Sequence, residues 1–334
     1  MRVNRTITTV DAHAAGEPLR IILSGLPPLN GTTMLERRAW MLAHHDDIRR
    51  TLLFEPRGHA DMYGAVVTPP VSPDADFGVL FLTNEGYSTM CGHGIIALTT
   101  ALLETGAFSR QSPCTTITYD SPAGLIRAEA TIEEDDVTRV AFENVPAFRL
   151  VKGLTIEIST GNVVVDVCFG GAFYALINAA TLGISVDRAN IALLVQLGME
   201  IKRAVEAAID VRHPLESELH GIYGTIISDE PRLPGSNGRN ITIFADAEVD
   251  RSPCGTGTSA RLAGLYADGK IRVGEPYVHE SVIDTTFTGR VLSETDVAGR
   301  PAIITEISGR GFVTGFHTFV VHPEDPTRDG FLVR

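Results

Sequence analysis

A short phrase that occurs twice constrains this chain more than any other feature. Residues 91–97 read Cys-Gly-His-Gly-Ile-Ile-Ala, and residues 254–260, 163 positions later, read Cys-Gly-Thr-Gly-Thr-Ser-Ala. The same offset places the apolar run 78–83 on the run 241–246. Behind each phrase, apolar residues recur at the spacing of a helix. The sequence therefore predicts a duplicated unit of strand, loop and helix, with a cysteine at or just before each helix N-terminus.

The two cysteines, Cys91 and Cys254, are predicted to be acid/base groups. Unpaired amides and the positive end of a helix dipole favour a thiolate, and they can lower the pKa of a cysteine from about 8.5 toward neutrality. A base that titrates near neutral pH suits proton abstraction. The same turns are anion sites, because glycines leave their amides accessible: Gly92, Gly94, Gly255 and Gly257. Two such turns that face one another can hold a substrate carboxylate and place a sulfur on each face of the neighbouring carbon.

Other interpretations of the phrase fit less well. Four cysteines in 334 residues is a pattern of intracellular proteins, in which disulfides are rare. Neither copy ends in the Lys-Ser/Thr of a P-loop, and neither has the spaced glycines and distal acid of a dinucleotide site. The remaining cysteines, Cys114 and Cys168, lie in strand-like segments and are expected to be structural.

Composition limits the partners. A length of 334 residues suffices for two domains, each with its own core. The formal net charge of −13 gives no basic surface for nucleic acid or acidic lipid. No run of 18 apolar residues and no secretory signal is present, so a cytoplasmic protein is expected. No metal is expected either, because the cluster 44–47, His-His-Asp-Asp, has no known ligand spacing and is interpreted as a solvated helix face.

Secondary-structure patterns favour an α+β fold. Helices are predicted over Met34–Leu52, over Asp187–Ile209 with Asp187 as its N-cap, and behind each cysteine as far as Gly106 or Gly269. Short β-rich runs bounded by turn residues fill most of the remaining chain. Strands are expected at residues 6–10, 65–68, 78–83, 115–119, 125–131, 139–143, 163–169, 240–245, 281–287 and 302–307.

Two strand-rich halves, each with a helix behind a cysteine, predict two similar lobes related by duplication. The first lobe, with Cys91, is assigned residues 1–147 plus 315–334, and the second, with Cys254, residues 148–314. The patterns leave open whether the strand 315–321 crosses back to the first lobe. An active site is expected in the cleft between the lobes, where ligand sites commonly lie.

The sequence resembles the proline racemase family, which includes hydroxyproline 2-epimerases and trans-3-hydroxyproline dehydratases. The resemblance covers nearly the whole chain, and the segments that carry it are residues 11–18, 55–64, 90–94, 170–175 and 250–258. Two of these segments contain the cysteine phrases. The other three read Asp-Ala-His-Ala-Ala-Gly-Glu-Pro, Glu-Pro-Arg-Gly-His-Ala-Asp-Met-Tyr-Gly and Gly-Gly-Ala-Phe-Tyr-Ala.

The resemblance implies a diaminopimelate-epimerase-like fold, with two pseudo-symmetric lobes that each wrap a β-barrel-like sheet around a central helix. It also implies a homodimer and catalysis on proline or hydroxyproline with no cofactor. Carried over by motif position, Cys91 and Cys254 are the acid/base thiols. Asp250 and the side chain of His93 approach the ring nitrogen of the substrate. The carboxylate-binding amides come from Gly92, His93, Gly255 and Thr256.

The second cysteine bears on the reaction. Family members that dehydrate 3-hydroxyproline generally carry Thr at this position, because elimination needs no proton donor on the opposite face. Cys254 therefore favours a racemase or epimerase that inverts the α-carbon. Segments 84–89 and 213–225 look more like the dehydratase branch, so dehydration of trans-3-hydroxy-L-proline to a pyrroline carboxylate is the alternative. A non-catalytic protein that holds a small carboxylate is a third interpretation, but it needs no thiol at both turns.

Overall fold

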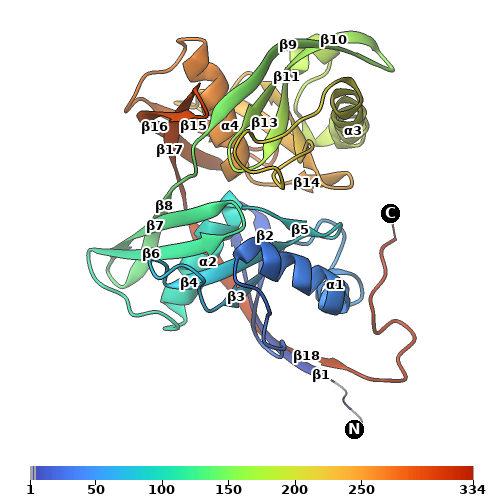
Figure 1. Ribbon diagram of the computed structural model, residues 1–334, viewed down its shortest axis with the longest axis vertical. Coiled ribbons are helices and arrows are strands. Elements are labelled where there is room, and N and C mark those ends of the chain that lie inside the picture. Colours follow the sequence, from blue (N-terminus) through green and yellow to red (C-terminus); the bar gives the residue numbers. More distant parts are fainter. Residues whose placement is uncertain (1–2, 4, 334) are drawn as a thin grey trace. The chain divides into compact units, whose positions relative to one another are not determined.

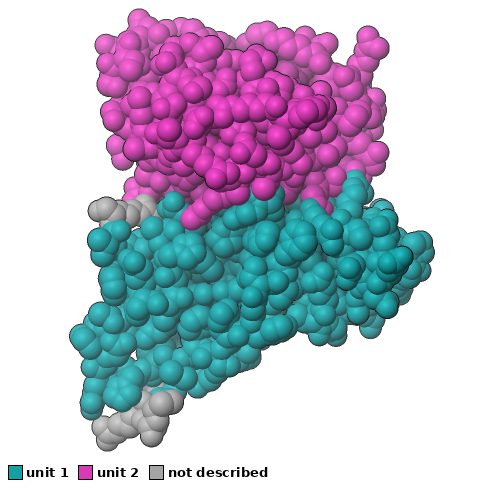
Figure 2. Space-filling view, turned by 180° about the vertical axis from the view of Figure 1, so that it is seen from behind, with its two compact units in different colours: residues 1–140, 310–334 teal, residues 141–309 magenta. Residues whose placement is uncertain are grey.

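The computed structural model describes residue 3 and residues 5–333 of the chain (Figure 1). The chain divides into two compact units (Figure 2). Unit 1 is formed by residues 1–140 and 310–334, and unit 2 by residues 141–309. The boundaries expected from sequence lie a few residues further along the chain at both crossings.

Unit 1 is a sheet with two α-helices, and the C-terminal part of the chain completes it. Strand β18 pairs antiparallel with β1 over the whole of β1, from Arg5 opposite Val321 to Ala14 opposite Gly311. The two strands form a long ribbon at the bottom of the view (Figure 1). The elements are β1 (Arg5–Ala14), β2 (Glu17–Ser24), α1 (Met34–Leu53), β3 (Gly64–Thr68), β4 (Phe77–Leu82), β5 (Tyr87–Ser88), α2 (Gly92–Glu104), β6 (Cys114–Ser121), β7 (Gly124–Glu133) and β18 (Gly311–Val321). Strand β8 (Asp136–Glu143) runs from unit 1 into unit 2.

Unit 2 is continuous in sequence. Its elements are β9 (Phe148–Ile158), β10 (Gly161–Phe169), β11 (Phe173–Asn178), the 3₁₀ turns η1 (Ala179–Leu182) and η2 (Arg188–Asn190), α3 (Ile191–Ala208), β12 (Gly224–Asp229), β13 (Gly238–Phe244), β14 (Glu248–Asp250), α4 (Gly255–Ala267), β15 (Pro276–Glu280), β16 (Thr286–Val297) and β17 (Arg300–Gly309). Asp187, the predicted cap, accepts from the amide of Ala189 and so caps η2, which leads directly into α3.

The two units repeat one order of strand pairing. In unit 1, β2 is parallel to β3, β3 is antiparallel to β4, and β4 is parallel to β6. In unit 2, β11 is parallel to β12, β12 is antiparallel to β13, and β13 is parallel to β15. The duplication read from the cysteine phrases therefore extends to the whole sheet. Strand β18 takes the place beside β1 that β9 takes beside β10, so the C-terminal strand does return to the first unit.

Helices α2 and α4 are the central helices of their units. Both have 13 residues, and α2 is buried from Gly92 through Leu103. In α4, residues 255–260 and 262–264 are buried. A helix that is apolar on all sides belongs in an interior, and glycines, alanines and threonines let the surrounding strands come close. Each cysteine phrase thus starts a helix that its own sheet surrounds.

Helices α1 and α3 cover the sheets from outside. In α3, buried residues recur on one face, and Gly198 lies where a Cβ would come 2.7 Å from Ile243 of β13.

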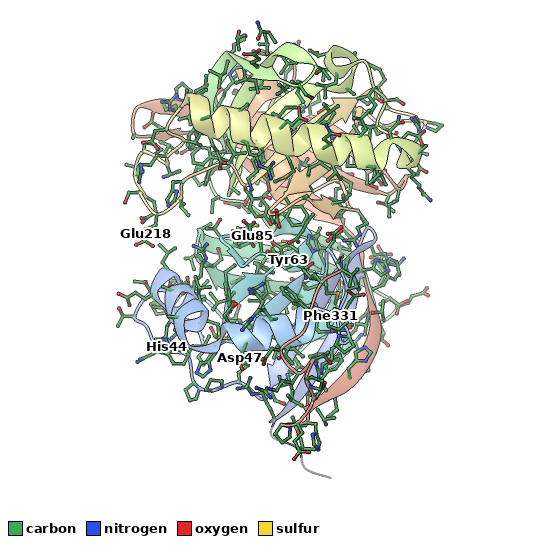
Figure 3. All side chains as sticks on the ribbon, turned by 90° about the vertical axis from the view of Figure 1, so that its right-hand side faces the viewer. His44, Asp47, Tyr63, Glu85, Glu218 and Phe331 are labelled. Carbon is green, nitrogen blue, oxygen red and sulfur yellow. The ribbon has the colours of Figure 1, made fainter. Side chains whose placement is uncertain are left out.

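The cluster 44–47 is on α1. His44 is exposed and Asp47 is half-buried in an ion pair with Arg5 (Figure 3), as expected for a solvated helix face.

One predicted strand is wrong. Residues 281–287 form a turn between β15 and β16 with only the last two residues in a strand. The side chain of Ser281 accepts from the amides of Ile283 and Thr285, and Asp284 has a φ of 67°. These local hydrogen bonds compete with the backbone hydrogen bonds of strand pairing and favour a turn.

Among the helices in the described part of the chain, none is long and apolar enough to cross a membrane.

Candidate active site

In unit 1, Cys91 is the N-cap of α2. Its backbone is extended, with φ −144° and ψ 111°, and its Sγ accepts a hydrogen bond from the amide of Gly94 at 3.3 Å. Gly94 has no room for a side chain, because a Cβ there would lie 2.5 Å from the ring of Phe81. The amides of Gly92 and His93 belong to the first helical turn, where no intrahelical acceptor exists. The start of α2 therefore offers a thiol and two backbone donors.

The imidazole of His93 lies against the same sulfur. Its Nδ1 is 3.1 Å and its Nε2 3.7 Å from Cys91 Sγ. Tyr63, which precedes β3 and is labelled in Figure 3, packs edge-on against this imidazole at a centroid distance of 4.8 Å. The Tyr63 hydroxyl lies 2.6 Å from Ser88 Oγ. A ring nitrogen at this distance from a thiol can accept its proton.

In unit 2, Cys254 is the N-cap of α4, and its Sγ accepts from the amide of Gly257 at 3.3 Å. Its backbone differs from that of Cys91, because φ is 65° and ψ 115°. A positive φ at a non-glycine residue costs about 1–3 kcal/mol and persists only when the surroundings hold it. Two hydrogen bonds do so here. The Cys254 amide donates to Ser252 Oγ at 3.1 Å, and its carbonyl accepts from Thr258 Oγ1 at 2.7 Å.

Two hydroxyl groups surround the sulfur of Cys254. Tyr174 of β11 is fully buried, and its hydroxyl lies 2.6 Å from Thr256 Oγ1 and 3.7 Å from Cys254 Sγ. Thr256 Oγ1 is 3.9 Å from the same sulfur. Burial raises the pKa of the Tyr174 phenol well above its ordinary value. Tyr174 is therefore a neutral hydroxyl that can donate to a thiolate on Cys254.

A buried carboxylate also lies beside Cys254. Asp250, at the end of β14, is 4% exposed and accepts from the amide of Ser252 at 2.8 Å and from its hydroxyl at 2.7 Å. Burial raises the pKa of Asp250 to about 6, while the Ser252 bonds, the Cys254 thiol and Arg251 act against this rise. Asp250 is thus mostly charged at neutral pH and becomes neutral in mild acid.

The predicted fall in pKa at the helix start is wrong for Cys254. Burial, followed by the charge of Asp250, raises the pKa of this thiol to about 12, against the smaller opposing effects of Tyr174, the Gly257 amide and Thr256. A helix dipole contributes about 0.3–1 kcal/mol, whereas desolvation of a buried charge can shift a pKa by several units. Cys254 is therefore a protonated thiol at neutral pH, which is the state of a proton donor.

A buried network holds the loop that carries Cys254. His279 of β15 is fully buried, and burial lowers its pKa to about 3, so it is neutral. Its Nδ1 lies 2.9 Å from Thr258 Oγ1, the group that donates to the Cys254 carbonyl. The Asn240 amide, 2.8 Å from His279 Nε2, donates to the Pro253 carbonyl at 3.0 Å. Both carbonyls before α4 are thereby fixed from the sheet behind them.

The turn between β10 and β11 supports α4 from another side. A Cβ on Gly170 would lie 2.3 Å from the carbonyl oxygen of Thr256, so this position tolerates only glycine. Asn144 donates to the Gly170 carbonyl at 2.7 Å and to Ser259 Oγ at 2.8 Å. The first turn of α4 is therefore packed against the backbone of Gly170, and the Asn144 side chain links the two by hydrogen bonds.

The other two cysteines lie away from both helix starts in the chain. Cys168 is fully buried in β10, and burial raises the pKa of its thiol. Cys114 is half-buried at the first position of β6. All four cysteines fall within the described residues, and none of them is in a disulfide. Residue 3 and residues 5–333 contain no group of three or more His, Cys, Asp or Glu side chains arranged to hold a metal ion.

Sequence reasoning missed three side chains that contact the Cys254 loop or its partners. Tyr174 lies in the Gly-Gly-Ala-Phe-Tyr-Ala segment, residues 170–175, which carries part of the family resemblance. This resemblance was the one signal in the sequence that could have identified Tyr174 as a residue near the site. Asn240 and His279 gave no signal, because single polar residues in strands follow no motif. All seven predicted site residues are at the two helix starts or, for Asp250, four residues before one.

Comparison with known proteins gives a consistent result. The sequence model of the family described as "Proline racemase" matches residues 9–332. The chain is 50% identical over 333 residues to the trans-3-hydroxy-L-proline dehydratase of Bacillus cereus and 47% identical over 335 residues to the 3-hydroxyproline 2-epimerase of Burkholderia multivorans. Each match covers 100% of both chains.

A solved structure matches the whole fold. The crystal structure of a hydroxyproline epimerase from Agrobacterium vitis with bound trans-4-hydroxy-L-proline has a TM-score of 0.93 and 33% sequence identity, and the match covers 100% of this chain and 97% of that one. The predicted α+β fold of the diaminopimelate-epimerase-like class is thereby confirmed.

Proposed function

The chain belongs to the proline racemase family, and from this premise we propose that it inverts the α-carbon of proline or a hydroxyproline with Cys91 and Cys254 as its two acid/base groups. The observation that carries the proposal is the matched placement of the two thiols. Each caps a central helix and accepts an amide hydrogen bond of 3.3 Å from the third helical residue. Two equivalent proton-transfer groups are what inversion requires, since one face loses a proton and the other gains one.

The α-proton of an amino acid is weakly acidic, so the site must stabilise a carbanion-like transition state. We assign the substrate carboxylate to the first-turn amides of Gly92 and His93 in one unit and of Gly255 and Thr256 in the other. Donors at a helix start favour an anion through both their N–H groups and the helix dipole. These amides are fixed before the substrate arrives, which minimises reorganisation during the reaction.

The substrate nitrogen is assigned to Asp250 and to the side chain of His93. A carboxylate beside the ring nitrogen favours its protonated form, and a retained positive charge next to the α-carbon stabilises a developing carbanion. Burial of Asp250 strengthens this interaction, because the charges meet in a region of low dielectric. No step of this reaction needs a metal or an organic cofactor, since the thiols move the proton and the amides and Asp250 stabilise the charge.

Dehydration of trans-3-hydroxy-L-proline is the second candidate, favoured by the 50% identity to the Bacillus cereus dehydratase. Its first step is the same abstraction of the α-proton, after which the 3-hydroxyl leaves and a pyrroline carboxylate forms. Elimination needs only one base, so Cys254 has no required role as the opposite donor. The thiol at position 254 is therefore the feature that weighs toward inversion.

The proposal is tested by incubating the protein in deuterated water with L-proline, trans-4-hydroxy-L-proline and trans-3-hydroxy-L-proline in separate reactions. Chiral chromatography and mass spectrometry then follow the products. Inverted amino acids with one deuterium at the α-carbon are expected from at least one substrate. A pyrroline carboxylate from the 3-hydroxy substrate, with no inversion of any of the three, would show that dehydration is the activity.

Matched variants separate an enzyme from a binding protein. Cys91→Ser and Cys254→Ser keep the size and polarity of the side chains at the two helix starts. If the protein is an enzyme, both variants keep ligand affinity but lose α-hydrogen exchange. A wild-type protein that binds these ligands and never exchanges the α-hydrogen would instead be a carboxylate-binding protein.

We also propose that the protein forms a homodimer. On β18, the side chains of Phe312, Phe316 and Val320 are 44%, 69% and 42% exposed. A bulge between Val313 and Gly315 places Phe312 on the other face of the strand. Phe316 and Val320 are four apart beyond the bulge and share one face, so these two make an exposed apolar patch of the kind that marks an interaction surface. Sedimentation velocity is expected to give a dimer that Phe316→Ser weakens. The control is Leu215→Ser in unit 2, where the side chain is also 69% exposed and no change is expected.

We place the protein in the cytoplasm, because Cys91 and Cys254 act only as thiol and thiolate. Reducing compartments keep cysteines in these states. Cell fractionation with detection of the native chain tests this placement, and recovery in an oxidising compartment would contradict it.

A further inference from the structure

Three polar side chains alternate along the segment that leads into α4. Asp250, Ser252 and Cys254 are two positions apart, and each accepts a hydrogen bond from a backbone amide further along the chain. Asp250 Oδ1 accepts from the Ser252 amide at 2.8 Å, and Ser252 Oγ accepts from the Cys254 amide at 3.1 Å. Cys254 Sγ in turn accepts from the Gly257 amide at 3.3 Å. The segment is therefore a series of linked turns, because Asp and Ser side chains readily bond the amide two residues on.

The side chain of Ser252 both donates and accepts. Its hydroxyl donates to Asp250 Oδ1 at 2.7 Å, while the same oxygen accepts from the Cys254 amide. Ser252 is 0% exposed, so bulk water does not compete for either bond. Inside a protein, a hydroxyl that accepts one hydrogen bond donates a stronger one. A single atom, Ser252 Oγ, thus links the Asp250 carboxylate to the Cys254 backbone.

Both partners of this hydroxyl are groups that the proposed reaction uses. Asp250 is assigned to the substrate nitrogen, and the two bonds from Ser252 both reach Oδ1, so they fix the carboxylate without occupying Oδ2. Cys254 is a proposed acid/base group with a φ of 65°, which persists only where the surroundings hold it. The bond from its amide to Ser252 is part of that support.

The duplicated segment of unit 1 differs at each of these points. The offset of 163 residues places Tyr87 where Asp250 lies and Thr89 where Ser252 lies. Burial raises the pKa of the Tyr87 phenol, so this position carries no negative charge at neutral pH. Cys91 has an extended backbone with a φ of −144°. A charged carboxylate and a cysteine with positive φ therefore occur together only in the segment that has Ser252.

We propose that Ser252 is a positioning residue for the proposed reaction, whose hydroxyl holds the Asp250 carboxylate and the Cys254 backbone in one arrangement. This inference rests on the proposed function, because Ser252 acts through two of the groups assigned there. A hydrogen bond donated to a carboxylate favours its charged form. Loss of the hydroxyl therefore raises the pH at which Asp250 becomes neutral, and it also loosens the backbone that presents Cys254 Sγ.

The other groups around Asp250 stay in place when Ser252 is changed. Burial raises the pKa of Asp250, and the Ser252 bonds oppose this rise, followed by the Cys254 thiol and Arg251. On β13, the residue paired with Asp250 is Thr242, which carries no charge. A change in the titration of Asp250 on loss of the Ser252 hydroxyl therefore reports that hydroxyl.

The pH dependence of α-hydrogen exchange in deuterated water tests the proposal. The substrate is whichever of L-proline, trans-4-hydroxy-L-proline and trans-3-hydroxy-L-proline the wild type exchanges fastest. In Ser252→Ala the acid limb of kcat/KM is expected to move up by about one to two pH units, as loss of a hydrogen bond to a charged group predicts. Above the limb, kcat/KM is expected to fall about threefold to tenfold through the loosened Cys254. An equal loss at every pH, with an unmoved limb, is the result of a merely structural role and would overturn the proposal.

Ser228→Ala is the matched control. Ser228 of β12 is also buried, and within the described part of the chain its hydroxyl has no hydrogen-bond partner. Its loss is expected to leave the limb and the plateau unchanged, and an equal shift in this variant would contradict a specific role of Ser252. Circular dichroism shows whether each variant folds. If Ser252→Ala does not, Ser252→Cys replaces it, since a thiol fills the space but donates only weakly, and the same upward shift is expected.

A titration without turnover separates this proposal from the proposed function. Carbon-13 NMR of protein labelled at the aspartate carboxyl carbons gives the pKa of Asp250, whose signal is the one missing from Asp250→Asn. We expect a pKa of about 6 in the wild type and a higher value in Ser252→Ala. If no substrate exchanges its α-hydrogen but Asp250 titrates in this way, the proposed function fails and the hold of Ser252 on Asp250 stands. Normal inversion with the same Asp250 pKa in both proteins would overturn only the role of Ser252.

Discussion

The hydroxyl of Tyr174 lies 2.6 Å from the hydroxyl of Thr256, so a residue of strand β11 reaches the first turn of α4. This contact predicts a role for a side chain that the sequence did not single out. Tyr174→Phe is expected to lower kcat about fivefold to tenfold, because one buried hydrogen bond contributes about 1 kcal/mol. Steady-state kinetics of α-carbon inversion measure the change. Tyr119→Phe is the control, since Tyr119 is a fully buried tyrosine 2.9 Å from Thr99 in unit 1. An equal loss in both variants would contradict a specific role.

Activity is expected to fall in mild acid because of Asp250. Its pKa is raised to about 6 by burial, so the carboxylate that we propose to hold the ring ammonium is lost as the pH drops through 6. A plot of kcat/KM against pH should therefore show an acid limb near 6. Asp250→Asn is expected to lower kcat/KM by about 10²-fold or more at pH 8 and to remove this limb from the residual activity. A limb that persists unchanged in Asp250→Asn would assign it to another group.

Cys254→Thr is the substitution that separates inversion from elimination. A threonine hydroxyl is far too weak an acid to deliver a proton, so inversion should fall by about 10²–10⁴-fold. Abstraction of the α-proton by Cys91 is retained, so formation of pyrroline carboxylate from trans-3-hydroxy-L-proline is expected to continue or to emerge. Product analysis by mass spectrometry decides this. Undiminished inversion in Cys254→Thr would exclude the thiol as the second base.

The buried His279 should couple stability to pH. Its pKa is lowered to about 3 in the folded protein and is about 6.5 when unfolded, so the unfolded state binds an extra proton between these values. Folding stability from this group is therefore complete above pH 6.5 and is lost as the pH falls toward 3. His279→Gln removes the titrating group and should flatten this part of a plot of unfolding free energy against pH. His279→Ala is expected to cost about 1–3 kcal/mol at pH 7, since Thr258 and Asn240 lose a partner. Urea unfolding at several pH values measures both effects.

Removal of metal ions is expected to leave the reaction unchanged. The proposed steps use the Cys91 and Cys254 thiols, the helix-start amides and Asp250. Dialysis against EDTA followed by assay should give the original kcat. A loss of activity that an added divalent cation restores would contradict the proposed chemistry.

Local features were predictable from sequence because their causes are local. The helix starts at Cys91 and Cys254 follow from apolar spacing and glycine turns, and both helices end just before the predicted glycines, Gly106 with a φ of 73° and Gly269 with a φ of 68°. The α1 and α3 helices were predicted for the same reason. The strand predicted over residues 281–287 is wrong, because hydrogen bonds of the Ser281 side chain override the strand preference of the β-branched residues there.

Features that depend on contacts between distant segments could not be predicted from the sequence. The approach of Tyr174 to Thr256 joins residues 82 positions apart, and His279 lies 21 positions from Thr258. The protonated state of Cys254 was also misjudged, because a helix start can be inferred from sequence whereas the degree of burial around one sulfur atom cannot.

The return of β18 to β1 has a consequence for how the chain is made. Unit 2 is a single continuous stretch and can fold as soon as it leaves the ribosome, whereas unit 1 lacks the partner of its first strand until β18 has been synthesised. Strand β18 also packs against α2, where a Cβ on Gly311 would lie 2.6 Å from Thr100. An unfinished chain therefore leaves the helix behind Cys91 open on one side. The helix that bears Cys91, a proposed acid/base group, is therefore enclosed only after residues 311–321 have been synthesised, later than every strand of unit 2.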